Sequence, residues 1–391
     1  MPKQLYCGPS SPSICHRRRT DGGDSVGAWF EKEQVFYAHK ARVGIRWACD
    51  LLKLGEGQKI LTPAYNCGSE ISPLLNCGAS VTLYRVDKEG QLDLEDLHKR
   101  YCSQTKAVYV THYFGFPQPT ASIRQFCDER QIPLIEDCAL SLFSCDGEAK
   151  LGSSGDISIF NFPKTLPVPD GGMVLINNPD LHVDSWKMRG PPIVRVSRNV
   201  PPLIKRYVLR MSAGSNLLYP ILLYILEHKQ SASSSNGAAR TALPDMPSNY
   251  YYDERLNDRK VSRLTERLLG TFDVATIISR RRTNFIHYLN FLSDLQDVEP
   301  LYEELPDGVC PLYFPVIVGN RGKVCQKLND VSISAVAWWA GYHRGLPWDE
   351  YPDACFLKDN LLVLPVHQQL SELHIEFISR KLIDCVRECS A

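Results

Sequence analysis

PLIEDCALSLFS at residues 133–144 and GDISIFNFPKTLPVPDGGMVLIN at residues 155–177 decide the fold class and hold the residues with the clearest chemistry. These stretches contain three short apolar runs, PLIEDC, ISIFNF and GMVLIN, which are interrupted by turn-forming Gly, Pro and Asp residues. Runs of this length and composition predict buried β-strands. The two stretches are therefore expected to form the centre of a sheet whose strands are joined by short connections.

Two charged residues accompany these predicted strands. Asp137 lies at the end of the first run, where a carboxylate is costly unless it meets a cation or a strong hydrogen-bond donor. A helix N-cap directly after the strand is an alternative role for it. Lys164 follows the second run and precedes the Gly171-Gly172 turn, which indicates a lysine held in a defined loop. An amine shielded from water in such a loop would be a good nucleophile, and a surface lysine is the alternative.

The chain on the N-terminal side of these stretches alternates between helical and strand-like patterns. Apolar residues at helical spacing predict a helix over residues 36–54, which ends before Gly55 and Gly57. Alternating helices and short β-rich runs predict an α/β fold with a largely parallel sheet, in which functional residues collect at the carboxyl ends of the strands. The other expected elements are strands at 59–65, 81–86, 107–114, 133–138, 157–162 and 172–177, and helices at 92–101 and 121–130.

The second half of the chain has a different pattern. Residues 203–227 combine basic and apolar residues, and their apolar run at 217–226 is too short to span a bilayer. A packed helical hairpin or a partner-facing helix is expected there, and contact with a membrane surface is the alternative. From residue 253 onward, helical patterns and two strands predict a smaller α+β domain. The expected organisation is a flexible leader at 1–27, a large domain at 28–248 with a loop or insert at about 188–248, and a small C-terminal domain at 249–391.

The composition is balanced in charge. The 391 residues include 44 Lys and Arg and 44 Asp and Glu, so neither nucleic acid nor an acidic membrane is predicted as a partner. The 14 cysteines form no Cys-x-x-Cys pair, so neither a zinc site nor a redox dithiol is predicted, and no metal is expected. No apolar stretch of signal-peptide length follows the arginines at 17–19, and a reducing, cytoplasmic location is expected.

Four motifs, in order along the chain, resemble the DegT-type sugar aminotransferases, a branch of the fold-type I enzymes that use pyridoxal 5′-phosphate (PLP). Residues 54–87 are similar to the family's block of turn, strand, Pro, helix, Gly-Ala, strand and Asp, and HYFGFP at 112–117 is similar to its His-x-x-Gly-x-Pro loop. IEDCA at 135–139 and GDISIFNFPKTLPVPDGG at 155–172 resemble the segments that carry its cofactor-binding aspartate and lysine. The end of the chain, at 361–378, also resembles the family's last strand and helix.

This resemblance implies a PLP-binding large domain with a mixed, mostly parallel sheet, and a smaller C-terminal α+β domain. It implies that Lys164 forms the Schiff base with PLP, and that Asp137 faces the protonated pyridine nitrogen and keeps the ring an effective electron sink. Members of the family that act as dehydratases have a histidine in place of this lysine. Since Lys164 is retained, transamination is predicted rather than dehydration.

Further residues are placed by the same resemblance. Ala41 and Arg42 occupy the phosphate-binding turn where the family usually has Gly-Thr, at a helix N-terminus whose backbone amides can bind a phosphate. Arg42 could add charge-assisted hydrogen bonds or could be a solvated helix residue. Asn161 matches a phosphate-binding serine, with Ser158 as the alternative. Asn257 matches an asparagine that reaches the cofactor phosphate of the partner subunit, which implies a homodimer.

The chain departs from the family pattern beside the expected cofactor ring. Cys67 stands where the family stacks an aromatic ring on PLP, and Tyr65 could replace that ring if the segment stays extended. Leu140 replaces the usual glutamine three residues after Asp137, which removes a polar contact. His112 could position the cofactor or the substrate, or it could be a structural loop histidine.

The predicted activity is the transfer of an amino group from an amino acid, expected to be glutamate, to a keto sugar. The sugar is expected to be nucleotide-linked and to enter polysaccharide or natural-product biosynthesis. Trp338, Trp339 and His343 could form a wall of the sugar site, although buried aromatic residues are more often part of a core. Other PLP chemistry on a non-sugar substrate, and a PLP-binding protein without turnover, stay open as alternatives. A dinucleotide-binding enzyme is less favoured, because Gly55-Glu56-Gly57 precedes its strand instead of following it.

Overall fold

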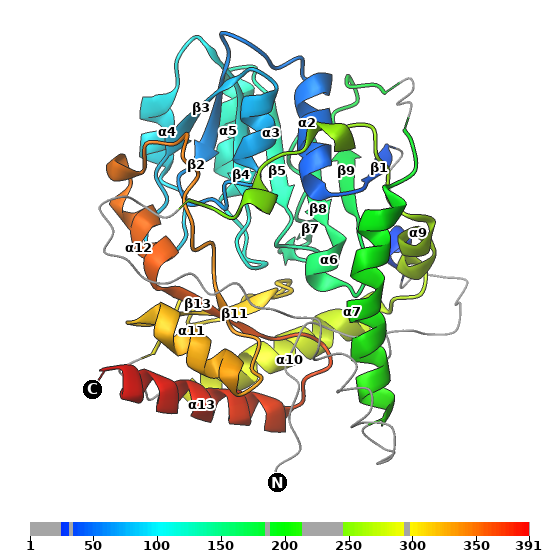
Figure 1. The fold of residues 1–391 in the computed structure, drawn as a ribbon. Helices are drawn as coiled ribbons and strands as arrows, with labels where there is room; N and C mark the ends of the chain where they lie inside the picture. Colours follow the sequence, from blue (N-terminus) through cyan, green and yellow to red (C-terminus); the bar gives the residue numbers. More distant parts are fainter. Residues whose placement is uncertain (1–24, 31–33, 184–187, 213–244, 293–297, 391) are drawn as a thin grey trace.

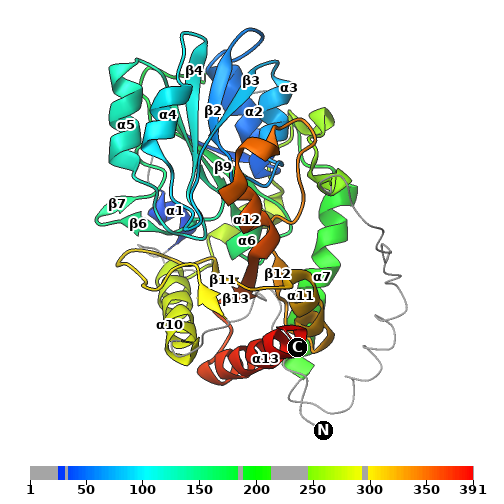
Figure 2. The ribbon, with the colours of Figure 1, turned by 90° about the vertical axis from the view of Figure 1, so that its left-hand side faces the viewer.

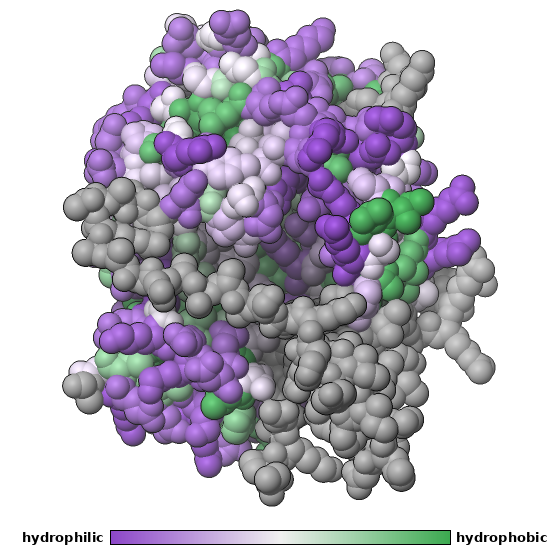
Figure 3. Space-filling view, viewed as in Figure 1, coloured by the Kyte–Doolittle hydropathy of each residue, from purple (hydrophilic) through white to green (hydrophobic). Residues whose placement is uncertain are grey.

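The computed structural model describes residues 25–30, 34–183, 188–212, 245–292 and 298–390. Most of them are organised around two sheets, one of seven strands and one of four. Figure 1 shows the seven-stranded sheet and its helices in the upper part of the molecule and the four-stranded sheet in the lower part. Among the residues that are coloured by hydropathy in Figure 3, most are hydrophilic, and the apolar ones gather in small separate patches.

The seven-stranded sheet has the order β1-β9-β8-β5-β4-β2-β3. Strands β2, β3, β4, β5 and β8 run parallel to their neighbours in that group, while β9 is antiparallel to both β8 and β1. The prediction of an α/β fold with a mixed, mostly parallel sheet is therefore confirmed. The strands, in sheet order, are Val35–Ala38, Gly172–Ile176, Ile157–Asn161, Leu134–Cys138, Thr105–Thr111, Lys59–Pro63 and Ser80–Tyr84.

Helices pack on this sheet and connect its strands. Figure 2 shows α4 and α5 on one side of the sheet and α2 and α3 on the other. The central strands β5 and β8 are buried along almost their whole length because helices cover the sheet in this way. These helices are α2 (Ala41–Leu51), α3 (Ile71–Asn76), α4 (Leu94–Arg100) and α5 (Thr120–Glu129), and the short α1 (Val26–Trp29) and α6 (Phe162–Thr165) accompany them.

The helix expected over residues 36–54 is wrong at its N-terminal end. Residues 35–38 form strand β1, which pairs with β9, and the helix runs only over Ala41–Leu51. Lys40 lies between β1 and α2 and has an extended backbone, with φ −146° and ψ 154°, so the helix cannot continue back into β1. Phe36 and Tyr37 have high strand propensity, and pairing with β9 outweighs the helical spacing of the apolar residues.

The four-stranded sheet is antiparallel and has the order β10-β11-β13-β12. Figure 1 shows α10, α11 and α13 around it on the side away from the large sheet. The strands are Glu299–Pro300, Tyr313–Ile317, Leu361–Pro365 and Val336–Ala337, and the helices are α10 (Val274–Leu292), α11 (Arg321–Asp330), α12 (Pro352–Asn360) and α13 (Glu372–Ser390). The expected division into domains at residue 248 stays a prediction.

Several connecting elements run between the two sheets. Helix α7 (Ile193–Ser212) contains the first part of the basic and apolar stretch, and α9 (Arg263–Leu269) precedes α10. Residues 1–24 of the leader expected at 1–27 lie outside the described residues, as does the apolar run at 217–226, whereas Val26 and Gly27 already belong to α1. Within the part of the chain that the structure describes, no helix is long and apolar enough to cross a membrane.

Candidate active site

A cavity of 520 Å³ opens where the carboxyl ends of the large sheet meet β12 of the small sheet. A cavity of this size can enclose a small ligand of several hundred daltons. Both halves of the chain contribute to its wall, which also includes the N-terminus of α2. Of the residues expected at the site, those that line the cavity are Ala41, Arg42, Cys67, Asp137, Asn161, Lys164, Trp338 and Trp339.

Asp137 lies at the carboxyl end of β5, in the middle of the large sheet, and is 5% exposed. The Tyr109 hydroxyl donates a hydrogen bond to its Oδ2 at 2.8 Å, and the backbone N–H of Ala139 donates one to its Oδ1, also at 2.8 Å. Burial raises the pKa of Asp137, and the positive charge of Lys164 and these two donors act in the opposite direction. The result is a carboxylate that is fixed in position and would be stabilised by a cationic ligand.

Lys164 is half-buried in the short helix α6, which directly follows β8. Because β8 is the neighbour of β5, the lysine and Asp137 leave the sheet at the same edge and line the same cavity. The Asp137 carboxylate and the Lys164 amine are also close enough to interact electrostatically. This edge of the sheet therefore presents one buried acid and one amine to a single ligand.

The N-terminus of α2 forms a second part of the wall. Lys40 is its N-cap residue and makes no side-chain capping bond, so the first backbone N–H groups of the helix have no side-chain cap. Gly172 of β9 packs directly on this end, since a Cβ at Gly172 would lie 2.5 Å from the Ala41 nitrogen. Asn161, at the end of β8, lines the cavity as well. Such an uncapped helix N-terminus favours an anion.

Arg42 lines the cavity but also has a structural contact. One of its terminal nitrogens, Nη1, donates to the backbone carbonyls of Asn249, Tyr250 and Tyr251 at 2.8–3.2 Å. These carbonyls belong to the turn that contains the 3₁₀ helix η1 (Ser248–Tyr250). Arg42 therefore ties the start of α2 to a segment far along the chain, and it brings a positive charge to the cavity at the same time.

Cys67 and Glu70 lie beside Asp137 and Lys164, and Glu70 is a site residue that the sequence did not reveal. The Cys67 backbone N–H donates to the Glu70 carboxylate at 2.8 Å, and Glu70 is 5% exposed. Burial and then the charge of Asp137 raise the pKa of Glu70. A Cys-x-x-Glu spacing between a strand and a helix fits an ordinary helix start, so the pattern gives no signal of its own.

His39 and Asp170 form a second buried pair in the cavity wall. His39 Nδ1 lies 3.0 Å from Asp170 Oδ2, and both residues line the cavity. Sequence reasoning missed this pair, because the two residues are far apart in the chain. The cluster of His39, Lys40 and Arg42 directly before and within the first turn of α2 is a signal that could have drawn attention to this position.

Trp338 and Trp339 follow β12 and form the wall opposite α2. Trp339 has a positive φ of 47°, and its ring packs on the Tyr65 ring at a centroid distance of 4.9 Å. Lys358, which is fully buried, donates to the carbonyls of Trp339 and Gly341 at 3.1 Å and 2.7 Å. A buried lysine therefore holds the loop in the conformation that presents the two indole rings.

Tyr65, Ser158, Asn257 and His343 lie outside the residues that line the cavity. Tyr65 is fully buried behind Trp339, and Ser158 donates a hydrogen bond to the Gly152 carbonyl at 2.7 Å. The Asn257 side chain accepts a hydrogen bond from the Tyr252 hydroxyl, and His343 Nδ1 accepts one from the Gly345 N–H. The proposed cofactor role of Asn257 concerns the partner's site, and it stays a prediction.

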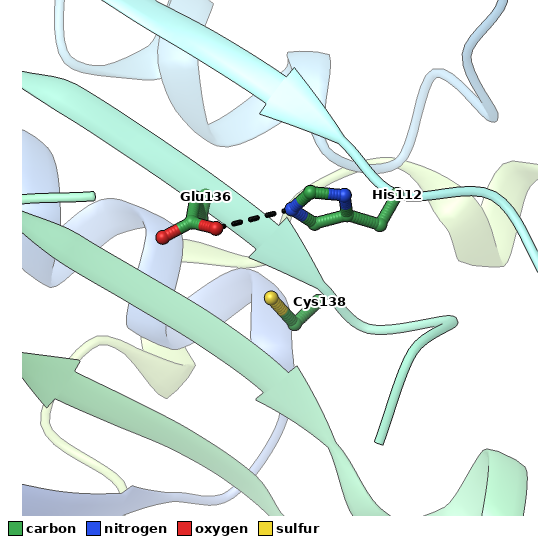
Figure 4. A group of neighbouring side chains, drawn as sticks. All are labelled: His112, Glu136 and Cys138. Atoms are coloured by element: carbon green, nitrogen blue, oxygen red, sulfur yellow. Dashed lines mark hydrogen bonds and ion pairs between the residues drawn. The ribbon is translucent and has the colours of Figure 1, made fainter. Parts of the chain in front are cut away.

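His112 is also outside the cavity, in a buried group with Glu136 and Cys138 that Figure 4 shows. His112 Nε2 lies 3.1 Å from Glu136 Oε1, and the backbone N–H groups of Gly152 and Gly155 donate to the same carboxylate. The three side chains could approach one metal ion, but these hydrogen bonds already occupy the Glu136 oxygens. We therefore interpret the group as a hydrogen-bonded part of the core that fixes β4 against β5.

Comparisons with known proteins agree with this geometry. The model of the DegT/DnrJ/EryC1/StrS aminotransferase family matches residues 29–211. GDP-perosamine synthase of Vibrio cholerae is 31% identical over 145 residues, which cover 36% of this chain and 39% of that protein. The dTDP-4-dehydro-2,3,6-trideoxy-D-glucose 4-aminotransferase of Saccharopolyspora spinosa is 29% identical over 375 residues, which cover 89% of this chain and 83% of that protein.

The solved structures show the same fold. The PLP form of the putative sugar aminotransferase Spr1654 of Streptococcus pneumoniae has a TM-score of 0.65 at 14% identity, covering 93% of this chain and 89% of its own. The chain spans about two fifths of the length of the GDP-perosamine synthase that it matches. The match of residues 29–211 includes Lys164 and Asp137 at the edge of the sheet. Residues 29–211 of the chain therefore match the model of the DegT/DnrJ/EryC1/StrS aminotransferase family, which the motifs of the chain also resemble.

Proposed function

We propose that this chain binds PLP on Lys164 and transfers an amino group from an amino acid, glutamate, to a keto sugar linked to a nucleotide. The observation that carries the proposal is the shared cavity of Asp137 and Lys164 at the edge of the large sheet. The names of two relatives, a GDP-sugar and a dTDP-sugar enzyme, support the nucleotide-linked substrate. A homodimer in the cytoplasm, with Asn257 of each subunit at the other's cofactor, belongs to the same proposal.

The residues in the cavity fit PLP. Asp137 is a buried acceptor whose carboxylate a pyridinium N–H would stabilise, and Lys164 is the amine beside it. The uncapped N-terminus of α2 is suited to the phosphate, and the 520 Å³ cavity has room for the cofactor together with a sugar. When bound there, PLP supplies an electron sink for the movement of an amino group.

The protein residues then have separate tasks. Lys164 would hold the cofactor through its amine Nζ, and the same amine, when free, would carry a proton as general base and acid. Asp137 holds the proton on the ring nitrogen, and Tyr109 and the Ala139 N–H keep its carboxylate in place. Trp338 and Trp339, on the other side of the cavity, exclude water and contact the sugar.

Reduction with borohydride followed by peptide mapping tests the proposal. Protein loaded with PLP should carry the phosphopyridoxyl label on Lys164, and glutamate should convert the bound cofactor to its amine form in the absorption spectrum. Lys164→Ala should lose the label, whereas the exposed Lys323→Ala on α11 should keep it. A label on another residue, or no spectral change with any amino donor, would contradict the proposed activity.

A further inference from the structure

We propose that His39, oriented by Asp170, binds the phosphate group of the cofactor through its Nε2 atom. This inference rests on the proposed function, because the anion is the phosphate of PLP. The phosphate site would then consist of the N-terminus of α2 and the buried imidazole of His39.

Asp170 fixes the orientation of the imidazole ring. Its Oδ1 accepts hydrogen bonds from the hydroxyls of Ser262 and Thr265, both at 2.6 Å. Its Oδ2 accepts from the Ser262 N–H at 2.9 Å and lies 3.0 Å from His39 Nδ1. Burial disfavours the ionised carboxylate, but these hydrogen bonds outweigh it and lower the pKa of Asp170. The carboxylate is thus ionised and can only accept, so His39 Nδ1 is the donor of the hydrogen bond to Oδ2.

The other ring nitrogen of His39 has no hydrogen-bond partner. Its side chain is fully buried, and Nε2 is among the buried polar atoms of the described residues without a partner. A buried polar atom without a hydrogen-bond partner destabilises the folded protein, so native proteins rarely leave one unpaired. Because His39 lines the cavity with Asp137 and Lys164, a bound ligand can supply the missing partner.

The surroundings of His39 favour a phosphate oxygen as that partner. His39 directly precedes Lys40, the N-cap of α2, so the imidazole stands beside the uncapped helix N-terminus. The side chains of Lys40 and Arg42 line the same cavity and bring two further cations. Burial, followed by the charges of Arg42 and Arg195, lowers the pKa of Lys40, and the charge of Asp253 acts in the opposite direction.

Both acceptors expected for the His39 ring, the Asp170 carboxylate and the cofactor phosphate, are anions. A phosphate oxygen of a dianion accepts hydrogen bonds, so Nε2 must donate, and Nδ1 already donates to Asp170. Bound in this way, the His39 ring would donate from Nδ1 to the Asp170 carboxylate and from Nε2 to the phosphate. Charge-assisted hydrogen bonds of this kind are about twice as strong as neutral ones.

Binding measurements on the apoprotein with PLP and with pyridoxal, which lacks the phosphate, test the proposal. His39→Asn keeps an amide donor near the position of Nδ1, and so the contact with Asp170, but it has no group at the position of Nε2. We expect this variant to bind PLP about ten- to a hundredfold more weakly than the unmodified protein, from the loss of one charge-assisted bond. Its affinity for pyridoxal should change by less than about twofold, because pyridoxal makes no phosphate contact.

Two further variants serve as controls. His39→Gln places an amide donor near the position of Nε2, so it should lose less PLP affinity than His39→Asn. His98→Asn, on the exposed face of α4, should bind both compounds as the unmodified protein does. Inorganic phosphate should compete with PLP for the unmodified protein more strongly than for His39→Asn.

The outcomes separate this inference from the proposed function. Equal losses of PLP and pyridoxal in His39→Asn would indicate a structural role and overturn the inference, as would unchanged PLP affinity. In both of those cases the proposed PLP chemistry stands. If the unmodified protein binds neither compound, the proposed function fails, and the assignment of His39 to its phosphate fails with it.

Discussion

The Tyr109 hydroxyl donates to Asp137 Oδ2 across the neighbouring strands β4 and β5, at 2.8 Å between two buried side chains. This hydrogen bond lowers the pKa of Asp137, against the effect of burial. The hydrogen bond to Asp137 Oδ1 comes from the backbone N–H of Ala139. Of the two hydrogen bonds, a substitution can therefore remove only the one from Tyr109.

Tyr109→Phe should therefore raise the pKa of Asp137 and weaken its hold on a protonated ring nitrogen. A hydrogen bond to a charged group contributes about 1.5–3 kcal/mol, so amino transfer from glutamate should slow by about ten- to a hundredfold. The rate of cofactor conversion, followed by absorbance across a range of pH, measures both effects. Tyr84→Phe, which removes a hydroxyl bonded to the Tyr109 carbonyl, is the matched control and should leave the rate nearly unchanged. Equal rates for Tyr109→Phe and the unmodified protein would show that the bond does not support the acid.

The buried Lys358 predicts a pH dependence of stability. Burial lowers the pKa of Lys358 to about 8, from 10.5 in the unfolded chain. Between these values the unfolded state binds more protons than the folded state, so the contribution of Lys358 to the free energy of unfolding increases as the pH rises from 8 to 10.5. The difference between the pKa of Lys358 in the folded and in the unfolded chain corresponds to about 3 kcal/mol.

Comparison with Lys358→Met isolates this contribution, because the other titrating groups are shared. Urea unfolding at pH 7 and at pH 10 should show the unmodified protein gaining stability relative to the variant at the higher pH. A difference between the two proteins that is independent of pH would mean that Lys358 titrates normally in the folded state.

Gly172→Ala should disturb the phosphate end of the cavity. The added Cβ would lie 2.5 Å from the Ala41 nitrogen and 2.6 Å from its Cα, and backbone atoms cannot move aside cheaply. We expect a loss of about 1–3 kcal/mol of stability and weaker binding of PLP. Gly322→Ala in α11 meets no atom within 4 Å and should be neutral or stabilising by up to about 1 kcal/mol. Thermal unfolding and PLP titration of both variants measure the contrast, and equal behaviour of the two would contradict the close packing of β9 on α2.

Trp339→Asn should separate the two halves of the reaction. Asparagine tolerates the positive φ of 47° at this position, so the loop is expected to keep its conformation while the indole ring is lost. The glutamate half-reaction should then change by less than about twofold, while kcat/KM for the sugar should fall about tenfold, as for the loss of one aromatic contact. Equal losses in both half-reactions would place Trp339 with the cofactor instead of the sugar.

That Asp137 and Lys164 line one cavity could be expected from the sequence, because the relevant information is local. Asp137 and Lys164 each follow an apolar run that becomes a strand, and neighbouring parallel strands bring their carboxyl ends to one edge. The alternatives Asn161 and Ser158 could also have been separated, because residues three apart on a strand point to opposite faces. Asn161 faces the cavity, whereas Ser158 turns to the Gly152 carbonyl.

The remainder depends on contacts between distant parts of the chain. The orientation of the His39 ring depends on Asp170, which in turn is held by Ser262 and Thr265, and no local pattern relates these four residues. In the same way, strand β1 forms inside a stretch with helical spacing only because β9, far along the chain, provides its partner. Pairing over such distances is a property of the folded chain and leaves no periodic signal.

Arg42 bonds to three carbonyls at residues 249–251, and the opposite wall of the cavity comes from β12 and the loop after it, more than 290 positions beyond the start of α2. During synthesis, the ribosome therefore releases Lys164 and Asp137 long before their enclosure exists. A nascent chain that ends before residue 330 contains Asp137 and Lys164 but lacks Trp338 and Trp339 of the cavity wall. The cavity wall is therefore complete only when the chain extends at least through Gly341, so a copy truncated before this residue should enclose a ligand less fully than the intact chain.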